Sequence, residues 1–288
     1  MVRARRKAAP AAPTAVVKSM LRAQVRAVFN DASRGETPVI RSDTAIFPPG
    51  SVIRAVHADV VSMMVGGMAA LLLQMLHPAA LRGVLDHSDF RADMLGRLRR
   101  TARFIAITTY ADRTEAEAAI DRVRRIHLRV TGTLADGTGY RASDPRLLAW
   151  VHVCEALCFL DAYIRYVDPR MSAKDQDIYF AQAAHVARAL GADPVPDTRA
   201  AAEALLASFR GELAVLPETR EVADLVLTPA AGNPASAAPH RMLGQAALDL
   251  LPRWAPAMLN LRPGRLMALP NRVATYAMGA ALRWSFRE

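Results

Sequence analysis

Hydrophobic residues recur every three to four positions along most of the chain after residue 50. This period is typical of α-helices that bury one face and expose the other. Only 6% of the 288 residues are aromatic, and Ala and Leu are abundant, which favours helices over sheets. We therefore expect an all-α fold, a single irregular bundle of about ten helices. Its packing should resemble that of globins rather than that of a four-helix bundle.

Capping residues and helix breakers predict where these helices begin and end. Ser88 is the expected N-cap of one helix, and Thr114-x-x-Glu117 reads as a capping box at the start of the next. Gly191 suits the end of a later helix. The expected helices cover about residues 52–76, 78–85, 88–110, 114–132, 144–167, 172–190 and 197–216.

The C-terminal part is richer in proline. Residues 228–239 combine Pro, Ala and Gly and are expected to form a loop. In the last fifty residues we expect three short helices, because proline interrupts helical hydrogen bonding. The breaks are expected at Pro252, Pro256, Pro263 and Pro270.

The first thirty residues differ in charge from the rest. They hold seven of the 37 Lys and Arg and none of the 27 Asp and Glu, so the remaining chain is nearly neutral. We expect residues 1–30 to form a basic, mostly flexible arm and residues 31–288 to form a single helical domain. Because the positive charge is concentrated in the arm, the composition does not favour nucleic-acid binding. A peripheral contact of the arm with an anionic surface is left open.

Val60 to Leu76 is an uncharged run. It is shorter than the roughly 20 apolar residues that span a bilayer, and Gly66-Gly67 suits close packing, so we expect a buried central helix. The basic start is not followed by the apolar stretch of a secretory signal. Cys154 and Cys158 lie four residues apart in an expected helix, which does not suit a structural disulfide. Together these features predict a cytoplasmic protein.

The residues that could carry chemistry lie on two consecutive expected helices. On the second of them, His127 shares an apolar stripe with Ile120, Val123 and Val130. A histidine in such a stripe is either a core residue with satisfied hydrogen bonds or a metal ligand through its neutral imidazole. Spacing alone leaves both interpretations open.

On the preceding helix, Arg97, Arg100 and Thr101 occupy positions i, i+3 and i+4 and therefore project from one side. They border the apolar positions Met94 and Ile105. The group is either a binding site for an anion at the edge of the core or a set of solvated side chains on the helix flank.

The segment Arg97-Leu98-Arg99-Arg100-Thr101, followed one helix later by Arg125-Ile126-His127, resembles the latex clearing protein and MpaB-type oxygenase family. The resemblance extends over about residues 50–225. Its other parts are Gly66-Gly67, His77-Pro78, the approach Tyr140-x-Ala142-x-Asp144-Pro145 to Trp150-Val151-His152, and Gly191.

The resemblance implies an all-α, haem b-dependent oxygenase or related oxidoreductase. Its substrates would be O2 and an apolar, isoprenoid-like small molecule. His127 would be the proximal ligand of the haem iron, and Arg97 and Thr101 would be pocket residues needed for haem retention or activity. Rubber-cleaving members have lysine where this chain has Arg100. A guanidinium is a very poor metal ligand, so we expect Arg100 to supply fixed positive charge near a propionate or the substrate.

His152 could line the same pocket, with a packing role as the alternative. A non-catalytic helical carrier of an apolar ligand would use the same pocket and is the alternative function. A phosphate loop, a dinucleotide fingerprint, a Gly-x-Ser-x-Gly elbow and paired Glu-x-x-His motifs are absent from the sequence. The remaining histidines show no spacing that argues for metal: His57, His77, His87, His185 and His240.

Overall fold

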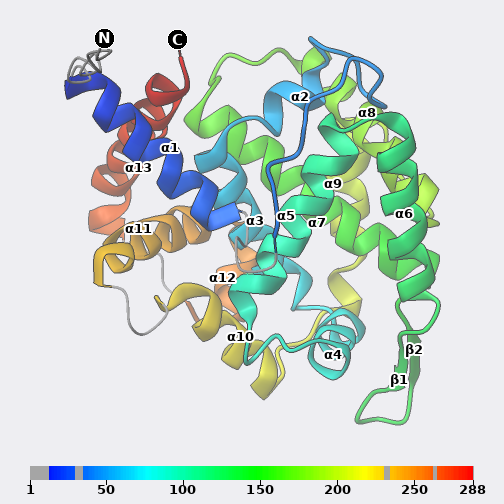
Figure 1. The fold of residues 1–288 in the computed structure, drawn as a ribbon. Helices are drawn as coiled ribbons and strands as arrows, with labels where there is room; N and C mark the ends of the chain where they lie inside the picture. Colours follow the sequence, from blue (N-terminus) through cyan, green and yellow to red (C-terminus); the bar gives the residue numbers. More distant parts are fainter. Residues whose placement is uncertain (1–12, 30–34, 230–233, 262–264, 288) are drawn as a thin grey trace, which may run out of the picture.

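The computed structural model describes residues 13–29, 35–229, 234–261 and 265–287. Within these residues the chain forms thirteen α-helices, one short 3-10 helix and a single two-stranded antiparallel sheet (Figure 1). The expected all-α fold is confirmed. The number of helices exceeds the expected ten, partly because two of them, α2 (Val52–Val56) and α12 (Trp254–Met258), have five residues each.

Two long helices pack against each other at the centre of the molecule, α3 (Val60–Gln74) and α7 (Pro145–Tyr166). They approach most closely at Gly66. A Cβ atom at this position would lie 2.8 Å from the carbonyl oxygen of Cys158 and 2.8 Å from Cδ1 of Phe159. The absence of a side chain at Gly66 therefore allows the two helices to touch, and α3 is buried over most of its length as expected.

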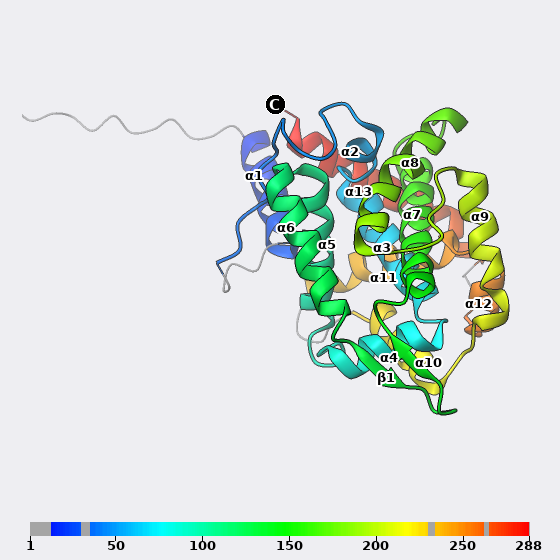
Figure 2. The same ribbon diagram turned by 90° about the vertical axis from the view of Figure 1, so that its right-hand side faces the viewer.

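The other helices surround this pair. Helix α8 (Ala173–Leu190) and α9 (Arg199–Ser208) pack on α7, whereas α10 (Pro217–Leu227) and α11 (Pro234–Leu250) pack on α3. Helix α13 (Arg265–Phe286) contacts α3, α11 and α1 (Pro13–Phe29). Helices α5 (Met94–Tyr110) and α6 (Arg113–His127) form a pair of their own, which stands to one side of α3 and α7 (Figure 2).

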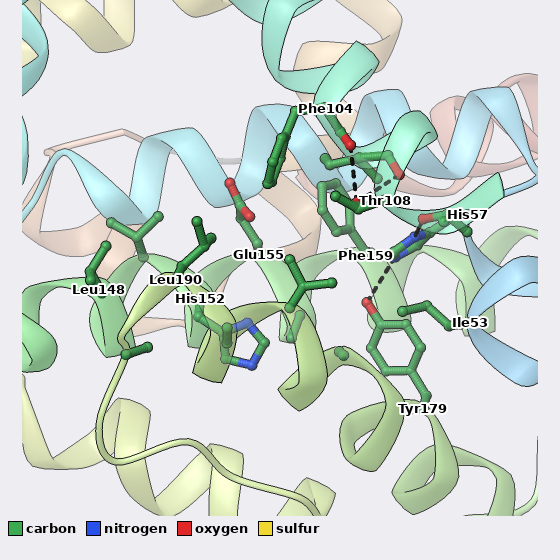
Figure 3. A pocket seen from close by; sticks show the side chains of 18 of the residues that line it. Ile53, His57, Phe104, Thr108, Leu148, His152, Glu155, Phe159, Tyr179 and Leu190 are labelled. Carbon is green, nitrogen blue, oxygen red and sulfur yellow. Dashed lines mark hydrogen bonds between the residues drawn. The ribbon is translucent and has the colours of Figure 1, made fainter. Parts of the chain in front are cut away.

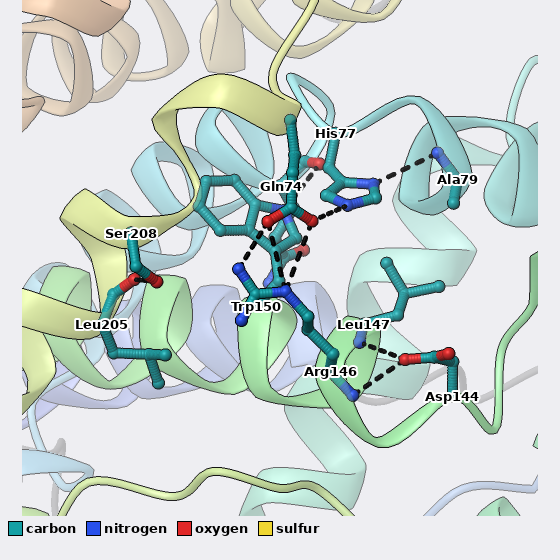
Figure 4. A network of polar contacts seen from close by, with 10 residues as sticks. Gln74, His77, Ala79, Asp144, Arg146, Leu147, Trp150, Leu205 and Ser208 are labelled. Carbon is teal, nitrogen blue, oxygen red and sulfur yellow. Dashed lines mark hydrogen bonds and ion pairs between the residues drawn. The ribbon is translucent and has the colours of Figure 1, made fainter.

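The chain bends by 107° between α3 and α4 (Pro78–His87). At this bend the Nδ1 atom of His77 accepts a hydrogen bond from the first turn of α4, at 3.2 Å. The Nε2 atom of His77 lies 3.7 Å from Glu212, which also pairs with Arg146 on α7. The indole N–H of Trp150 donates to the carbonyl of Gln74 at 3.2 Å. These polar contacts tie the end of α3 to the start of α7 (Figure 4).

The expected caps of α5 and α6 were wrong. Helix α5 begins at Met94 because Asp93 accepts a hydrogen bond from the backbone N–H of Gly96, at 2.8 Å. Ser88 instead bonds back to the carbonyl of Val84 at the end of α4. Helix α6 is capped by Asp112, two residues before Thr114. In both places a carboxylate takes the capping position, as Asp commonly does.

The helix expected to reach residue 132 ends at His127. The next residues form β1 (Thr131–Thr133), which pairs with β2 (Gly139–Arg141) so that Gly132 faces Tyr140. The expected turn at Asp136-Gly137 connects the two strands, and Gly137 has a φ of 88°. A Cβ at Gly132 would lie 2.6 Å from the ring of Tyr140. The ring therefore packs on a backbone that lacks a side chain.

The C-terminal boundaries also differ from the expectation. Residues 234–239 belong to α11 rather than to a loop, and Pro270 lies inside α13 instead of ending a helix. Pro256 is tolerated because it lies in the first turn of α12, where its missing N–H has no helical partner. Helix α9 is capped by Thr198 rather than Asp197 and ends at Ser208, short of residue 216. Pro263 lies outside the described residues.

Helix α7 is long and apolar enough to cross a bilayer by length and composition, and 67% of its apolar stretch is buried inside the protein. Its contacts with α3, α8 and α9 account for that composition. Within the basic segment expected to be flexible, residues 13–29 form α1, and residues 1–12 lie outside the described part. The division into an arm and one domain, and the cytoplasmic location, stay predictions.

Candidate functional site

A cavity of about 120 Å³ lies between α7 and the helices α2, α5, α6 and α8. Its walls are mostly aliphatic and aromatic side chains, including Phe104 from α5, Leu148 from α7 and Leu190 from α8 (Figure 3). Such apolar walls with a few polar groups are typical of sites for small molecules. The polar groups therefore decide what chemistry the cavity can support.

Helix α7 contributes one face to the cavity. His152, Glu155 and Phe159 are spaced three and four residues apart and line the cavity from that face (Figure 3). Other residues of α7, Cys154 and Cys158 among them, are fully buried in the core. Burial raises the pKa of both thiols well above its usual value, and both cysteines are free, as expected.

His127, the last residue of α6, reaches the opposite side of the cavity. Its Nδ1 atom is buried and has no hydrogen-bond partner among the described residues. Burial lowers the pKa of His127, and the positive charge of Arg97 lowers it further. The imidazole is therefore neutral near pH 7, which is the form that binds metals.

His152 presents a second neutral imidazole to the cavity. Its Nε2 atom is buried and, within the described part of the chain, lacks a hydrogen-bond partner. Burial, assisted by the charge of Arg188, lowers the pKa of His152 to about 4. A buried polar atom without a partner is costly, so His127 and His152 both point to a group that binds in this cavity.

Glu155 was not among the site residues expected from the sequence. Burial raises the pKa of its carboxyl to about 7, while a hydrogen bond from Gln74 and the charge of Arg97 oppose this rise. The carboxyl can therefore hold or release a proton near neutral pH. A signal was present in the sequence: Glu155 is the only charged residue between Arg146 and Asp161.

His57 also lines the cavity, although its spacing gave no reason to choose it. Its Nδ1 lies 2.9 Å from the hydroxyl of Thr109, and its Nε2 lies 3.3 Å from the hydroxyl of Tyr179. Burial lowers the pKa of His57 to about 3. Both ring nitrogens have partners, so the neutral ring is held in place by α5 and α8.

The three polar residues expected on α5 separate into two environments. Arg97 is partly buried, and its charge influences both His127 and Glu155. Burial lowers the pKa of Arg97, with a smaller effect from Arg100. Arg100 and Thr101 are exposed and do not line the cavity.

Local partners explain the positions of the two exposed residues. The Nη1 atom of Arg100 lies 3.4 Å from Asp93, and the hydroxyl of Thr101 donates to the carbonyl of Arg97 at 3.2 Å. The structure thus places His127 and His152 on one cavity. Arg97 does not line the cavity but is near enough for its charge to act on His127, and Arg100 and Thr101 are exposed. The functional roles expected for all five stay predictions.

Comparison with protein families indicates the class of reaction. A family model described as "ER-bound oxygenase mpaB/B'/Rubber oxygenase, catalytic domain" matches residues 54–284. The chain belongs to this family. The match confirms the resemblance inferred from the sequence and spans the cavity from His57 to Ala192. Searches of the curated proteins and of the solved structures gave no match.

As a member of the mpaB/rubber oxygenase family, the chain is an enzyme with an oxygenase catalytic domain, so its substrates include O2 and a small molecule. Apart from Phe47 and Ile53, the residues that line the cavity lie within the matched region, and their mostly apolar side chains suit an apolar substrate. In the described part of the chain, no three His, Cys, Asp or Glu residues lie together in a way that could hold a metal ion.

Proposed function

We propose that this oxygenase depends on haem b, with His127 as the iron ligand, and that it acts on an apolar, isoprenoid-like small molecule. The observation that carries the proposal is the partly buried, neutral imidazole of His127, which lines an apolar cavity and whose buried Nδ1 has no hydrogen-bond partner in the described part of the chain. The oxygenase family of the chain supplies the reaction class.

The residues fit haem in their chemistry. A porphyrin supplies four nitrogen ligands, so one imidazole from the protein is enough to hold the iron. Haem propionates are anionic, and the partly buried cation Arg97 lies near His127. The cavity of about 120 Å³ is smaller than a porphyrin. Haem binding therefore requires a wider cavity than the one in this structure.

Each polar group of the cavity has a distinct task in this proposal. Bound haem supplies the activation of O2. His127 binds the iron, and the apolar walls, Phe104 and Phe159 among them, contact the substrate and exclude water. His152 stays unprotonated near neutral pH, whereas the carboxyl of Glu155 can hold or release a proton there. The chain's own proton donor is therefore Glu155.

An absorption spectrum of the purified protein tests the proposal. We expect a Soret band in the protein as isolated or after addition of haem, and we expect His127→Ala to lose most of it. The matched control is His87→Ala, because His87 lies outside the cavity and bonds the carbonyl of Thr131. Protein that is colourless and also fails to take up added haem would contradict the proposal.

The iron, haem and lipid content of the same preparation distinguishes the oxygenase from the alternative function, a carrier of an apolar ligand. A helical carrier would use the apolar walls without redox chemistry. Bound lipid in a preparation that contains neither iron nor haem would favour the carrier. Iron and haem in equal amounts would favour the oxygenase.

A further inference from the structure

The two terminal helices lie side by side on one side of the molecule (Figure 1). Two side chains of α1 bind the C-terminal end of α13. Lys18 donates to the carbonyl of Arg287 at 2.7 Å, and Arg22 donates to the carbonyl of Ser285 at 2.6 Å. Because the carbonyls at a helix C-terminus carry partial negative charge, these cations hold α1 in place.

The outward side of α13 is apolar, contrary to what is normal for a surface helix. Leu269, Val273, Tyr276 and Trp284 follow a helical spacing and are 70%, 61%, 51% and 41% exposed. Met278 and Leu282 pack against the core from the buried side of the same helix, which also carries the polar residues Thr275 and Ser285. Their hydroxyls bond the helix's own carbonyls. Helix α13 thus carries apolar side chains on its exposed side as well as on its buried side.

Helix α1, which packs beside α13, also exposes apolar side chains. Val16, Val17 and Met20 are 47%, 47% and 60% exposed. The Nζ atom of Lys18 lies 5.2 Å from the centre of the Trp284 ring. A cationic side chain of α1 therefore contacts an aromatic side chain of α13. We call the exposed residues of both helices the terminal-helix surface: Val16, Val17, Met20, Leu269, Val273, Tyr276, Trp284 and Phe286.

The segments that form this surface are rich in positive charge. The sequence contains no Asp or Glu in residues 1–30 or in residues 250–287, whereas these segments contain seven and six Lys and Arg. Arg272 and Arg283 pair with acids from other helices. In the described part of the chain, Lys18 and Arg22 contact backbone carbonyls and aromatic rings, which are neutral and leave the charge of both side chains in place.

We propose that the terminal-helix surface binds the surface of an anionic lipid bilayer. Apolar helix faces with Trp and Phe, flanked by Lys and Arg, lie in the interface between headgroups and acyl chains. A second copy of this chain would bring two positive surfaces together, which like-charge repulsion opposes. Anionic headgroups complement the same charge. This inference does not depend on haem and adds a location to the proposed oxygenase function.

Sedimentation of the full chain with lipid vesicles tests this inference. We expect binding to vesicles of phosphatidylcholine mixed with phosphatidylglycerol and little binding to phosphatidylcholine alone. Each cation near the surface contributes about a fivefold effect on affinity, and added salt should weaken binding. The fluorescence of Trp284 should shift to the blue with vesicles, and Trp284→Phe should remove that shift.

Single charged substitutions locate the surface. Val273→Asp and Leu269→Asp should each lower the partition coefficient about tenfold or more, because each removes an inserted apolar side chain. The matched control is Ile40→Asp. Ile40 is 84% exposed and lies between α1 and α2, outside the terminal-helix surface. All three positions are exposed, so the variants should keep the circular dichroism spectrum of the parent.

Three outcomes would overturn the inference. One is the absence of binding to anionic vesicles, and another is equal loss of binding in all three variants. The third is a dimeric mass in light scattering that becomes monomeric in Val273→Asp without any vesicle binding, which would assign the surface to a second copy. None of these outcomes depends on whether the preparation contains haem, so they leave the proposed oxygenase function untouched.

Discussion

Gln74 and Glu155 are joined across the α3–α7 contact by a hydrogen bond of 3.3 Å from Nε2 of Gln74 to Oε1 of Glu155. The same amide nitrogen donates to the carbonyl of Val151 at 3.2 Å. This bond stabilises the charged form of Glu155, but burial favours the neutral form more strongly and raises the pKa to about 7. The pKa of Glu155, which lines the cavity, therefore depends on Gln74 at the end of α3.

Replacing this carboxyl should change how stability depends on pH. The pKa of Glu155 is about 7 when folded and about 4.3 when unfolded. A raised pKa in an acid means that the folded state binds the proton more tightly. The stability that this proton contributes is present at low pH and is lost as the pH rises from about 4 to about 7. Glu155→Gln should therefore gain on the order of 2 kcal/mol over the parent between pH 5 and pH 8.

Urea unfolding at the two pH values measures the effect. Glu115→Gln is the matched control, because Glu115 lies in the first turn of α6 and is exposed. The control should follow the parent at both pH values. A constant offset between Glu155→Gln and the parent would show that Glu155 has an ordinary pKa.

Arg97 and Arg100 should differ in their effect on haem retention, if haem is bound as proposed. Arg97 is partly buried and its charge acts on His127, whereas Arg100 is exposed beside Asp93. Loss of a charge-assisted hydrogen bond costs about 1.5–3 kcal/mol, so Arg97→Gln should release haem roughly ten to a hundred times more readily. Arg100→Gln and Thr101→Val should stay within about twofold of the parent.

Transfer of haem to an excess of an acceptor globin measures this release. The outcome that would refute the assignment is a larger effect of Arg100→Gln than of Arg97→Gln. That result would return the anion-binding role to the outer side of α5.

Two adjacent glycines in α3 should respond differently to alanine. A Cβ at Gly66 would lie 2.8 Å from a backbone oxygen of α7, so Gly66→Ala must separate the two central helices and should cost about 1–3 kcal/mol. At Gly67 the nearest atom would be 3.7 Å away. Gly67→Ala should therefore leave the free energy of unfolding unchanged or raise it by up to about 1 kcal/mol, because alanine has a higher helix propensity than glycine. Denaturant unfolding distinguishes the two variants. An equal change in the free energy of unfolding for both would show that the stability of the fold does not depend on the close approach of α3 and α7 at Gly66.

Local sequence patterns predicted most helices, because spacing and caps act over a few residues. Ser172 and Gly191 bound α8 as expected, since the hydroxyl of Ser172 accepts a hydrogen bond from the nearby N–H of Asp175 and Gly191 adopts the left-handed backbone conformation. The strand at Thr131–Thr133 was missed because its pairing depends on a partner segment. The long helix α13 was missed because Pro270 was read as a break, although it lies inside the helix.

The candidate site was predictable only in part. His127 came from helical spacing, and the family resemblance gave it a role. Glu155 and His57 were not chosen, because their position on the cavity depends on how α2, α5, α7 and α8 pack together. No pattern within a single helix contains that information. Arg97, Arg100 and Thr101 share a side of α5, yet the spacing could not show that α5 lines the cavity only from Phe104 onward.

The packing behind Phe159 links the interior of the protein to substrate selectivity. The ring of Phe159 borders the cavity on one side and the bare backbone of Gly66 on the other. Any side chain gained at position 66 would press this ring toward the cavity and narrow it. If the substrate binds in this cavity as proposed, a change at position 66 would alter which molecules the enzyme accepts, although Gly66 does not line the cavity. Mutant libraries restricted to the lining residues would leave that position unexplored.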